Sequence, residues 1–348
     1  MEGNRSNILL EVKDLTFSFR TYAGEVQAVR GVDLSLERGK SLGIVGESGC
    51  GKSVTAKSIV RLNPEAPRGM YKKGQVLFEG RDLLALPEKE MQKIRAQEIR
   101  MIFQDPMTSL NPTMTVGKQI MEGILKYGNK TKEEARKIAL DTLALAGIPS
   151  PEDRFKQYPH EFSGGMRQRA MIALAMAVNP KLLIADEPTT ALDVTIQAQI
   201  LDLIKDIQKQ YNTALIMITH DLGVVANIAD DIAVMYAGKV MEYGTAEDIF
   251  EHPAHPYTWG VLQSIPPEDT SDRKPLHPIL GTPPDLFDPP KGCPFAARCP
   301  YAMKVCNQVY PAAYAQEGEG HWCSCWLYHP NAMDTVNPIT EKGVKKHE

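Results

Sequence analysis

Eight residues near the start of the chain have the types and the spacing of a phosphate-binding loop. Residues 46–53 read Gly-Glu-Ser-Gly-Cys-Gly-Lys-Ser, and they lie between the apolar run Ser41–Val45 and a stretch with helical character. In this context the glycines let main-chain amides surround phosphate oxygens, Lys52 reaches the β- and γ-phosphates, and the Ser53 hydroxyl binds Mg²⁺. We therefore predict a site for a nucleoside triphosphate and Mg²⁺. The predicted nucleotide contacts here are Gly46, Ser48, Gly49, Cys50 through its main-chain N–H, Gly51, Lys52, Ser53 and Val54.

Four polar side chains follow apolar runs that read as buried strands. Asp186 and Glu187 end the run Leu-Leu-Ile-Ala. His220 follows Ala-Leu-Ile-Met-Ile-Thr, and Gln104 follows Ile-Phe. Because ligands of such sheets bind at the carboxyl ends of the strands, we predict that Asp186 binds Mg²⁺ and that Glu187 is the base for the attacking water. We assign a γ-phosphate contact to His220, and contacts with Mg²⁺ and the water to Gln104; a structural histidine and a loop glutamine are the alternatives.

A second anion-binding turn lies between these elements. Ser163, Gly164 and Gly165 precede the apolar run Met171–Val178. This order predicts a turn that opens a helix, with bare main-chain N–H groups at the helix start. Since the chain already has a phosphate loop, we infer that the turn serves a nucleotide held by another copy or by a paralogue.

The bulk composition excludes several classes of protein. The 348 residues carry 39 basic and 43 acidic side chains, so net charge gives no argument for nucleic acid binding. The start of the chain lacks the features of a signal peptide, and the longest apolar runs fall short of the roughly 20 residues of a membrane span. We expect a soluble, cytosolic chain in which structural disulfides are disfavoured.

The two parts of the chain differ in composition. The first 250 residues alternate apolar runs and helical patterns, as α/β domains do. All three tryptophans, five of six cysteines and 15 of 25 prolines lie in residues 251–348. We therefore predict a nucleotide-binding domain over residues 1–250, with a helical subdomain at about 105–175, and a C-terminal extension over residues 251–348.

The cysteines of the extension suggest a metal centre. Cys293, Cys299, Cys306, Cys323 and Cys325 are spaced too loosely for a zinc knuckle built from C-x₂-C pairs. Several thiols near proline-rich turns, in a chain expected in a reducing compartment, still favour metal binding. Zinc and an all-cysteine iron–sulfur cluster suit the thiolates equally, and a set of buried free cysteines is the alternative.

Together these motifs resemble the ATP-binding-cassette (ABC) ATPases, and they occur in that family's order. In chain order, residues 46–53 are similar to Walker A, Gln104 to the Q-loop, residues 162–166 to the signature, residues 184–187 to the end of Walker B, residues 191–193 to the D-loop and His220 to the switch histidine. The signature has Phe162 where leucine is common and Met166 where glutamine is common. The resemblance implies an α/β P-loop NTPase with a RecA-like core, an antiparallel β subdomain and a helical subdomain.

The resemblance also implies a head-to-tail dimer that encloses two ATP molecules. Each nucleotide would meet the Walker A loop of one subunit and the signature residues Ser163, Gly164 and Gly165 of the other, with Asp193 at the same interface. An aromatic residue before the first core strands stacks on adenine in this family. We assign this role to Tyr22, with Phe19 as the alternative and a packed strand residue as the structural explanation.

Further stretches resemble the ATPases of peptide/nickel-type importers, especially dipeptide and oligopeptide importers. Residues 161–169 and 186–195 are similar to that subfamily, and so is His-Pro-Tyr-Thr at 255–258, which opens its extension. Some members carry a [4Fe-4S] cluster in a tail with a Gly-Cys-Pro-Phe, Arg-Cys-Pro, Cys, Gly-His and Cys pattern. Carried over to this chain, the pattern assigns the cluster to Cys293, Cys299, Cys306 and Cys325, with Cys323 as the alternative fourth ligand and zinc as the alternative metal. A structural staple is favoured over a redox role.

The resemblance predicts the ATPase subunit of an importer of dipeptides or oligopeptides. Its expected partners are a second ABC ATPase subunit (this chain or a paralogue), two transmembrane permeases and an extracytoplasmic substrate-binding protein, with no nucleic acid. The expected location is the cytoplasmic face of the cell membrane, as a peripheral subunit. An ATPase for import of nickel or another small solute, and a soluble ABC ATPase without a transport role, are the alternatives.

Overall fold

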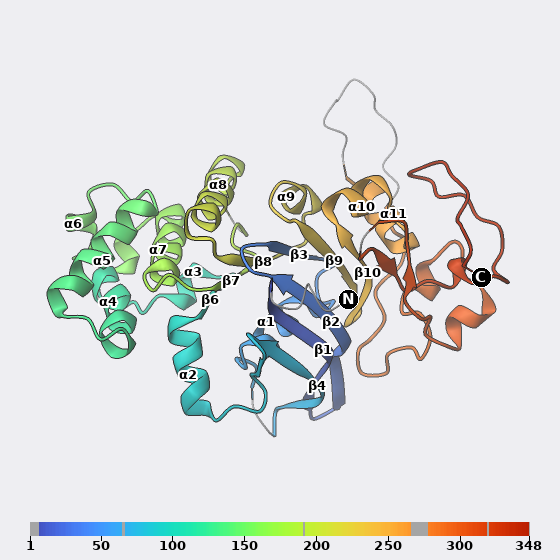
Figure 1. Cartoon of the computed structure of the whole chain (residues 1–348), viewed down its shortest axis with the longest axis horizontal. Coiled ribbons are helices and arrows are strands. Elements are labelled where there is room, and N and C mark those ends of the chain that lie inside the picture. Colours follow the sequence, from blue (N-terminus) through green and yellow to red (C-terminus); the bar gives the residue numbers. More distant parts are fainter. Residues whose placement is uncertain (1–6, 65–66, 191, 266–277, 319, 348) are drawn as a thin grey trace.

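A computed structural model describes residues 7–64, 67–190, 192–265, 278–318 and 320–347. Its centre is an eight-stranded sheet with the strand order β11-β12-β10-β9-β3-β8-β7-β6 (Figure 1). The strands are β3 (Ser41–Val45), β6 (Ile99–Ile102), β7 (Leu182–Asp186), β8 (Ala214–Thr219), β9 (Asp231–Tyr236), β10 (Lys239–Thr245), β11 (Tyr314–Ala315) and β12 (Trp322–Cys323). The five strands from β9 to β6 are parallel, whereas β10, β12 and β11 pair antiparallel. Every residue of β3, β7 and β8 is buried, which explains why these strands are almost continuously apolar.

A second sheet, wholly antiparallel, packs on the nucleotide-binding side of the molecule. It has the order β2-β1-β4-β5, with β1 (Ile8–Thr21), β2 (Gly24–Glu37), β4 (Gly69–Phe78) and β5 (Arg81–Asp82). Its apolar face shares one core with β3 and the first helix, so the two sheets sandwich that helix. The predicted antiparallel β subdomain is therefore present.

One group of helices gathers at an edge of the central sheet, and the others lie along the rest of the molecule (Figure 1). They are α1 (Lys52–Ile59), α2 (Glu88–Gln97), α3 (Pro106–Ser109), α4 (Val116–Tyr127), α5 (Lys132–Leu145), α6 (Pro151–Arg154), α7 (Gly164–Met176), α8 (Val194–Tyr211), α9 (Leu222–Ala226), α10 (Ala246–Glu251) and α11 (Pro256–Gln263). Helices α3 to α7 gather at the β6 edge of the sheet, at the left of Figure 1. No helix within the described residues is long and apolar enough to cross a bilayer.

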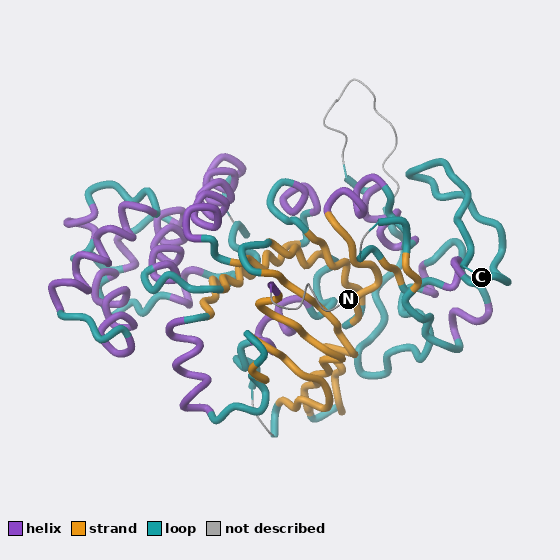
Figure 2. Tube along the Cα trace, in the orientation of Figure 1, coloured by secondary structure: helices purple, strands orange, loops and turns teal. Residues whose placement is uncertain are grey.

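The C-terminal extension contains little regular structure. Figure 2 shows mostly loop around the C-terminus, with the 3₁₀ turns Ala296–Arg298, Lys304–Asn307 and Trp326–Tyr328. The extension is nevertheless continuous with the central sheet, because β12 pairs with β10. Trp259, Tyr257 and Phe295 are almost fully buried. Trp259 packs in an apolar cluster within the extension, whereas Tyr257 and Phe295 share a cluster with residues of β3, β9 and β10. The domain limits predicted from the sequence stay a prediction.

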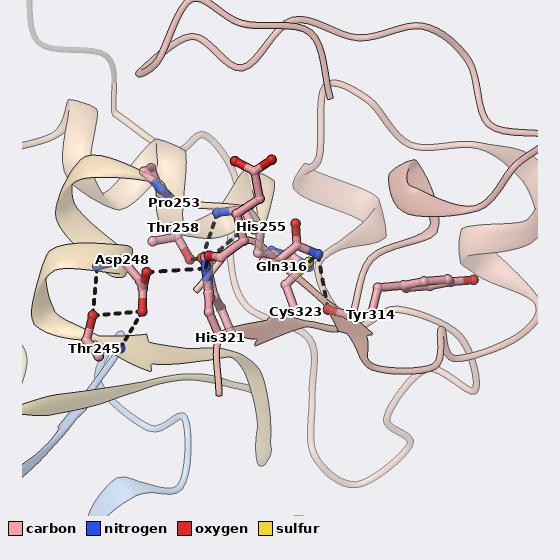
Figure 3. A network of polar contacts seen from close by, with 12 residues as sticks. Thr245, Asp248, Pro253, His255, Thr258, Tyr314, Gln316, His321 and Cys323 are labelled. Carbon is pink, nitrogen blue, oxygen red and sulfur yellow. Dashed lines mark hydrogen bonds and ion pairs between the residues drawn. The ribbon is translucent and has the colours of Figure 1, made fainter. Parts of the chain in front are cut away.

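A buried carboxylate, Glu242 on β10, anchors the extension to the sheet. Its Oε1 accepts the Ala254 N–H at 2.6 Å and lies 3.0 Å from His321 Nε2. Its Oε2 accepts the His255 N–H at 2.8 Å and the Thr258 hydroxyl at 2.5 Å. Burial by itself would lower the pKa of His321, but the contacts with Glu242, Asp248 and the Glu317 main chain together raise it. Figure 3 shows how this network joins α10, α11 and the tail around His321.

Candidate functional site

The phosphate-binding loop connects β3 to α1 at the middle of the central sheet. Gly51 has φ 102°, and a Cβ there would lie 2.3 Å from the Ala28 carbonyl oxygen, so the loop requires glycine at this position. The Lys52 ammonium group is buried, and it donates to the carbonyl oxygens of Gly46 at 2.6 Å and Glu47 at 3.0 Å. The lysine is thus held over the loop, at the place where phosphate oxygens are expected.

Two of the predicted Mg²⁺ ligands, Ser53 on α1 and Asp186 at the end of β7, contact each other directly. The Ser53 hydroxyl donates to Asp186 Oδ1 at 2.7 Å. Burial raises the pKa of Asp186, and the bond from Ser53 acts in the opposite direction. A hydroxyl and a carboxylate are oxygen ligands of the kind that Mg²⁺ takes beside substrate phosphates, so the residues present fit the ion.

Glu187 is held by three side chains that meet at the ends of parallel strands. Its Oε2 accepts the Gln104 amide at 3.0 Å and the Thr190 hydroxyl at 2.9 Å, and its Oε1 lies 3.5 Å from His220 Nδ1. Glu187 itself has φ 46°, an unusual value for a residue other than glycine, and such strain often occurs at functional sites. The structure therefore brings together all three predicted catalytic residues. The sequence analysis did not predict the contact of Glu187 with Thr190, whose hydroxyl lies three residues further along the chain.

A cavity of about 500 Å³ opens in front of these groups, within the range of small-molecule sites. The predicted residues that line it are Ser48, Gly49, Gly51, Lys52, Ser53, Val54, Gln104, Glu187 and His220. Gly46, Cys50 and Asp186 are buried and do not line it.

The aromatic residue at this cavity is Phe19 and not Tyr22. Phe19 lines the cavity, while the Tyr22 side chain is fully exposed at the β1–β2 hairpin. Our first choice for adenine stacking, Tyr22, therefore lies away from the cavity, and the alternative, Phe19, is in place. The stacking role itself stays a prediction.

The signature residues lie apart from the chain's own cavity. Ser163 caps α7 by accepting the Met166 N–H at 3.3 Å, and Ser163 and Gly164 are exposed. Asp193 caps α8 in the same way, through the Ile196 N–H at 3.0 Å. None of these residues lines the cavity, and position 191 of the D-loop lies outside the described residues.

The extension reaches the phosphate-binding loop through two side chains that sequence reasoning missed. The Arg298 guanidinium donates to Glu47 Oε2 at 2.7 Å and to the Tyr236 hydroxyl at 3.0 Å. The Glu47 N–H in turn donates to the Tyr257 hydroxyl on α11 at 3.0 Å. The two contacts with Glu47 join residues more than 200 positions apart, so no local pattern could have indicated them.

Four of the five extension cysteines face one small cavity. Cys293, Cys299, Cys306 and Cys325 line it together with His255, whereas Cys323 pairs β12 with β10 elsewhere. Burial raises the pKa of Cys293 to about 12 and that of Cys299 to about 11. Among the described residues, no group of three His, Cys, Asp or Glu side chains is arranged to hold a single metal ion.

Comparisons with known proteins agree with this geometry. A family model described as "ABC transporter" matches residues 29–190, and "Oligopeptide/dipeptide transporter, C-terminal region" matches residues 241–306. The oligopeptide transport ATP-binding protein OppD of Bacillus subtilis is 60% identical over 96% of this chain and 93% of its own length. The chain belongs to the ABC ATPases of oligopeptide and dipeptide transport.

Further relatives and solved structures support the same placement of this transport ATPase. The dipeptide transport ATP-binding protein DppD of B. subtilis is 56% identical over 94% of the chain and 97% of its own length. A dimeric ATP-binding cassette, MJ0796, solved with ADP and phosphate, matches with a TM-score of 0.61 at 28% identity over 68% of this chain and 98% of its own. The predicted fold class is confirmed, and the chain is an ATP hydrolase.

Proposed function

We propose that this transport ATPase powers the uptake of oligopeptides or dipeptides through separate transmembrane permeases. The chemical part of the proposal is carried by one observation: Glu187 is held by Gln104 and Thr190 next to the Ser53–Asp186 pair. The choice of peptide as cargo is supported by the names of the relatives and by the matching C-terminal region.

The geometry supports a division of labour around the bound nucleotide. Lys52 would exchange its carbonyl partners for phosphate oxygens, and Ser53 and Asp186 would hold Mg²⁺, with Gln104 as the further predicted ligand. The ion supplies positive charge to the phosphate oxygens. Glu187 would accept a proton from the attacking water, while Gln104 and Thr190 fix the orientation of its carboxylate. His220 would contact the γ-phosphate.

We further propose a head-to-tail dimer in which Ser163, Gly164 and Gly165 complete the partner's site. The start of α7 is exposed and does not line the chain's own cavity, which supports this arrangement. Val194, next to Asp193, is an apolar side chain that is 83% exposed and suits an interface. The second subunit is this chain or a paralogue, two permeases and an extracytoplasmic binding protein complete the complex, and the ATPase lies peripherally at the cytoplasmic face of the membrane.

The substitution Glu187→Gln tests the proposal. It keeps the size of the side chain but removes the base, so we expect ATP binding close to wild type and hydrolysis lower by about 10²–10⁴-fold. Uptake of a labelled peptide by cells with this variant as their sole copy should be lost. Glu90→Gln, on the exposed side of α2, is the matched control and should leave hydrolysis and uptake unchanged.

Three outcomes would contradict the proposal. Hydrolysis at the wild-type rate in Glu187→Gln would remove Glu187 from the reaction. If cells with Glu187→Gln lost the uptake of nickel and kept the uptake of peptide, the small-solute alternative would be favoured. Copurification with DNA or ribosomes, in place of permeases, would favour a role outside transport.

We also propose that Cys293, Cys299, Cys306 and Cys325 hold a [4Fe-4S] cluster that staples the extension. The four thiols share one cavity, and His255 lines the same cavity with its Nε2 unpartnered among the described residues. His255 Nδ1 accepts the Tyr257 N–H at 3.0 Å, so the neutral ring carries its proton on Nε2 and can donate it to a cluster sulfide. Zinc is the alternative metal at the same four thiols.

Metal analysis tests the cluster. We expect a brown protein with iron and acid-labile sulfide in equal amounts, and loss of both in Cys293→Ser. Cys323→Ser is the matched control, because Cys323 lies outside the cavity, and it should keep the colour. Stoichiometric zinc without iron would refute the assignment. A change in ATPase activity on reduction of the cluster would show a regulatory role in place of the staple.

A further inference from the structure

One lining residue of the nucleotide cavity comes from the C-terminal extension. Leu286 lines the cavity together with residues of β1, β2 and the phosphate-binding loop. Position 286 lies within the region that matches the importer C-terminal model and outside the region that matches the ABC transporter model. The extension therefore contributes a side chain to the lining of the cavity.

The cavity has both polar and apolar lining residues. The polar groups are the phosphate-binding loop with Lys52 and the groups around Glu187. The apolar side chains are Phe19, Val26, Ala28 and Leu286. Because the loop would hold the phosphates, the apolar side chains are left to contact the base of the nucleotide.

The main chain of an edge strand holds Leu286 in position. The Gln27 N–H of β2 donates to the Leu286 carbonyl oxygen at 2.9 Å, and β2 is the edge of its sheet. Val26 and Ala28 lie on either side of Gln27 in the strand. Successive side chains of a strand point to opposite faces, so Val26 and Ala28 share one face, and both line the cavity. Further along the segment, the Arg30 guanidinium donates to the Pro290 carbonyl oxygen at 2.9 Å.

We propose that Leu286 packs against the base of the bound ATP, opposite or beside Phe19, and so makes the extension a direct determinant of nucleotide affinity. The contact is apolar and leaves the phosphates untouched. Leu286 also packs into the apolar cluster that contains Tyr236, Phe295 and Cys293. Disorder of the extension would therefore remove one lining residue of the base pocket.

Substitution of Leu286, read out with paired ligands, tests the contact. MgADP carries the base, whereas Mg-pyrophosphate occupies the phosphate-binding loop without a base, and neither is consumed in turnover. In the full chain, we expect Leu286→Ala to weaken MgADP binding about tenfold, which corresponds to ~1.4 kcal/mol, and to leave pyrophosphate binding unchanged. The KM for ATP should rise by a similar factor with kcat unchanged.

Two control variants make the result specific. Leu286→Met keeps an apolar side chain of similar volume and should retain wild-type affinity for MgADP. Leu280→Ala removes a leucine that is 79% exposed on the same segment and does not line the cavity. It should change the affinity for neither MgADP nor pyrophosphate.

Two results would overturn the proposal: unchanged MgADP affinity in Leu286→Ala, or equal weakening of MgADP and pyrophosphate. Equal weakening would show an effect on the phosphate-binding loop in place of the base. Failure of the wild-type chain to bind either ligand would instead contradict the nucleotide site itself, so the two failures are distinguishable.

Discussion

The nucleotide core and the C-terminal extension position functional groups in different ways. In the core, buried parallel strands end at one edge of the sheet and bring Glu187 and His220 to the same cavity, with the buried Asp186 directly beside Glu187 in the chain. In the extension, loops and short turns are held by a few polar contacts around Glu242 and Arg298. Regular hydrogen bonding spreads the positioning over many residues, whereas the extension concentrates it in a few side chains.

The extension also contributes directly to the central sheet and to the surroundings of the nucleotide site. It adds β12 to the central sheet, places Arg298 against the phosphate-binding loop and places Leu286 in the nucleotide cavity. We therefore expect changes in the extension to affect nucleotide binding, in proportion to how directly each contact reaches the cavity.

The largest effect is expected from Glu242→Gln, which tests whether a single carboxylate anchors the extension. Glutamine has the shape of glutamate but carries no charge. Its NH₂ group cannot accept hydrogen bonds, so the donors that now face one of the carboxylate oxygens would lose their acceptor. Because breaking a buried ionic contact is costly, we expect a loss of about 3–5 kcal/mol in the free energy of unfolding of the extension. Hydrogen exchange and limited proteolysis would report this loss within residues 251–347.

The matched control for that substitution is Glu247→Gln on the exposed side of α10. It should leave exchange and proteolysis at wild-type levels. Equal protection of the extension in Glu242→Gln and wild type would show that packing of the apolar cores, and not the buried carboxylate, fixes the extension to the sheet.

A smaller effect is expected from Arg298→Ala, which tests the second route from the extension to the nucleotide. Loss of the contact with Glu47 should loosen the phosphate-binding loop and weaken MgADP and pyrophosphate equally, by about fivefold, or ~1 kcal/mol. This pattern differs from that of Leu286→Ala, which should affect MgADP alone. Both affinities can be measured by calorimetry on the full chain.

Arg298→Lys distinguishes charge from geometry at this contact. Lysine keeps the charge but cannot donate to Glu47 and Tyr236 at the same time with a planar group, so we expect partial recovery. If Arg298→Ala binds both ligands as the wild type does, the contact with Glu47 is structural and does not influence the loop.

Much of the nucleotide site could be predicted from the sequence. Residues 46–53 carry a spacing that main-chain geometry requires, and Gly51 shows why, because no side chain fits beside the Ala28 carbonyl group. Asp186 and His220 were placed correctly at strand ends, since an apolar run that stops at a polar residue marks where a buried strand emerges. The contact of Thr190 with Glu187 escaped prediction because a hydroxyl in a loop carries no such mark.

Other features depended on neighbours that the local sequence does not reveal. The sequence favoured Tyr22 over Phe19 as the aromatic residue at the nucleotide, but the path of β1 into its turn places Phe19, and not Tyr22, at the cavity. Similarly, spacing alone left five cysteines as candidates. The pairing of β12 with β10 separates Cys323 from the cavity that the other four share.

The sequence by itself therefore determined the chemistry of this protein, because the phosphate-binding loop and the strand-end carboxylates form from residues close together in the chain. The tertiary structure alone decided how the extension takes part. The contacts of Leu286 with the cavity, of Arg298 with Glu47 and of Glu242 with His321 join distant segments. Such contacts follow from the packing of whole elements against one another, and packing leaves no fixed spacing in the sequence.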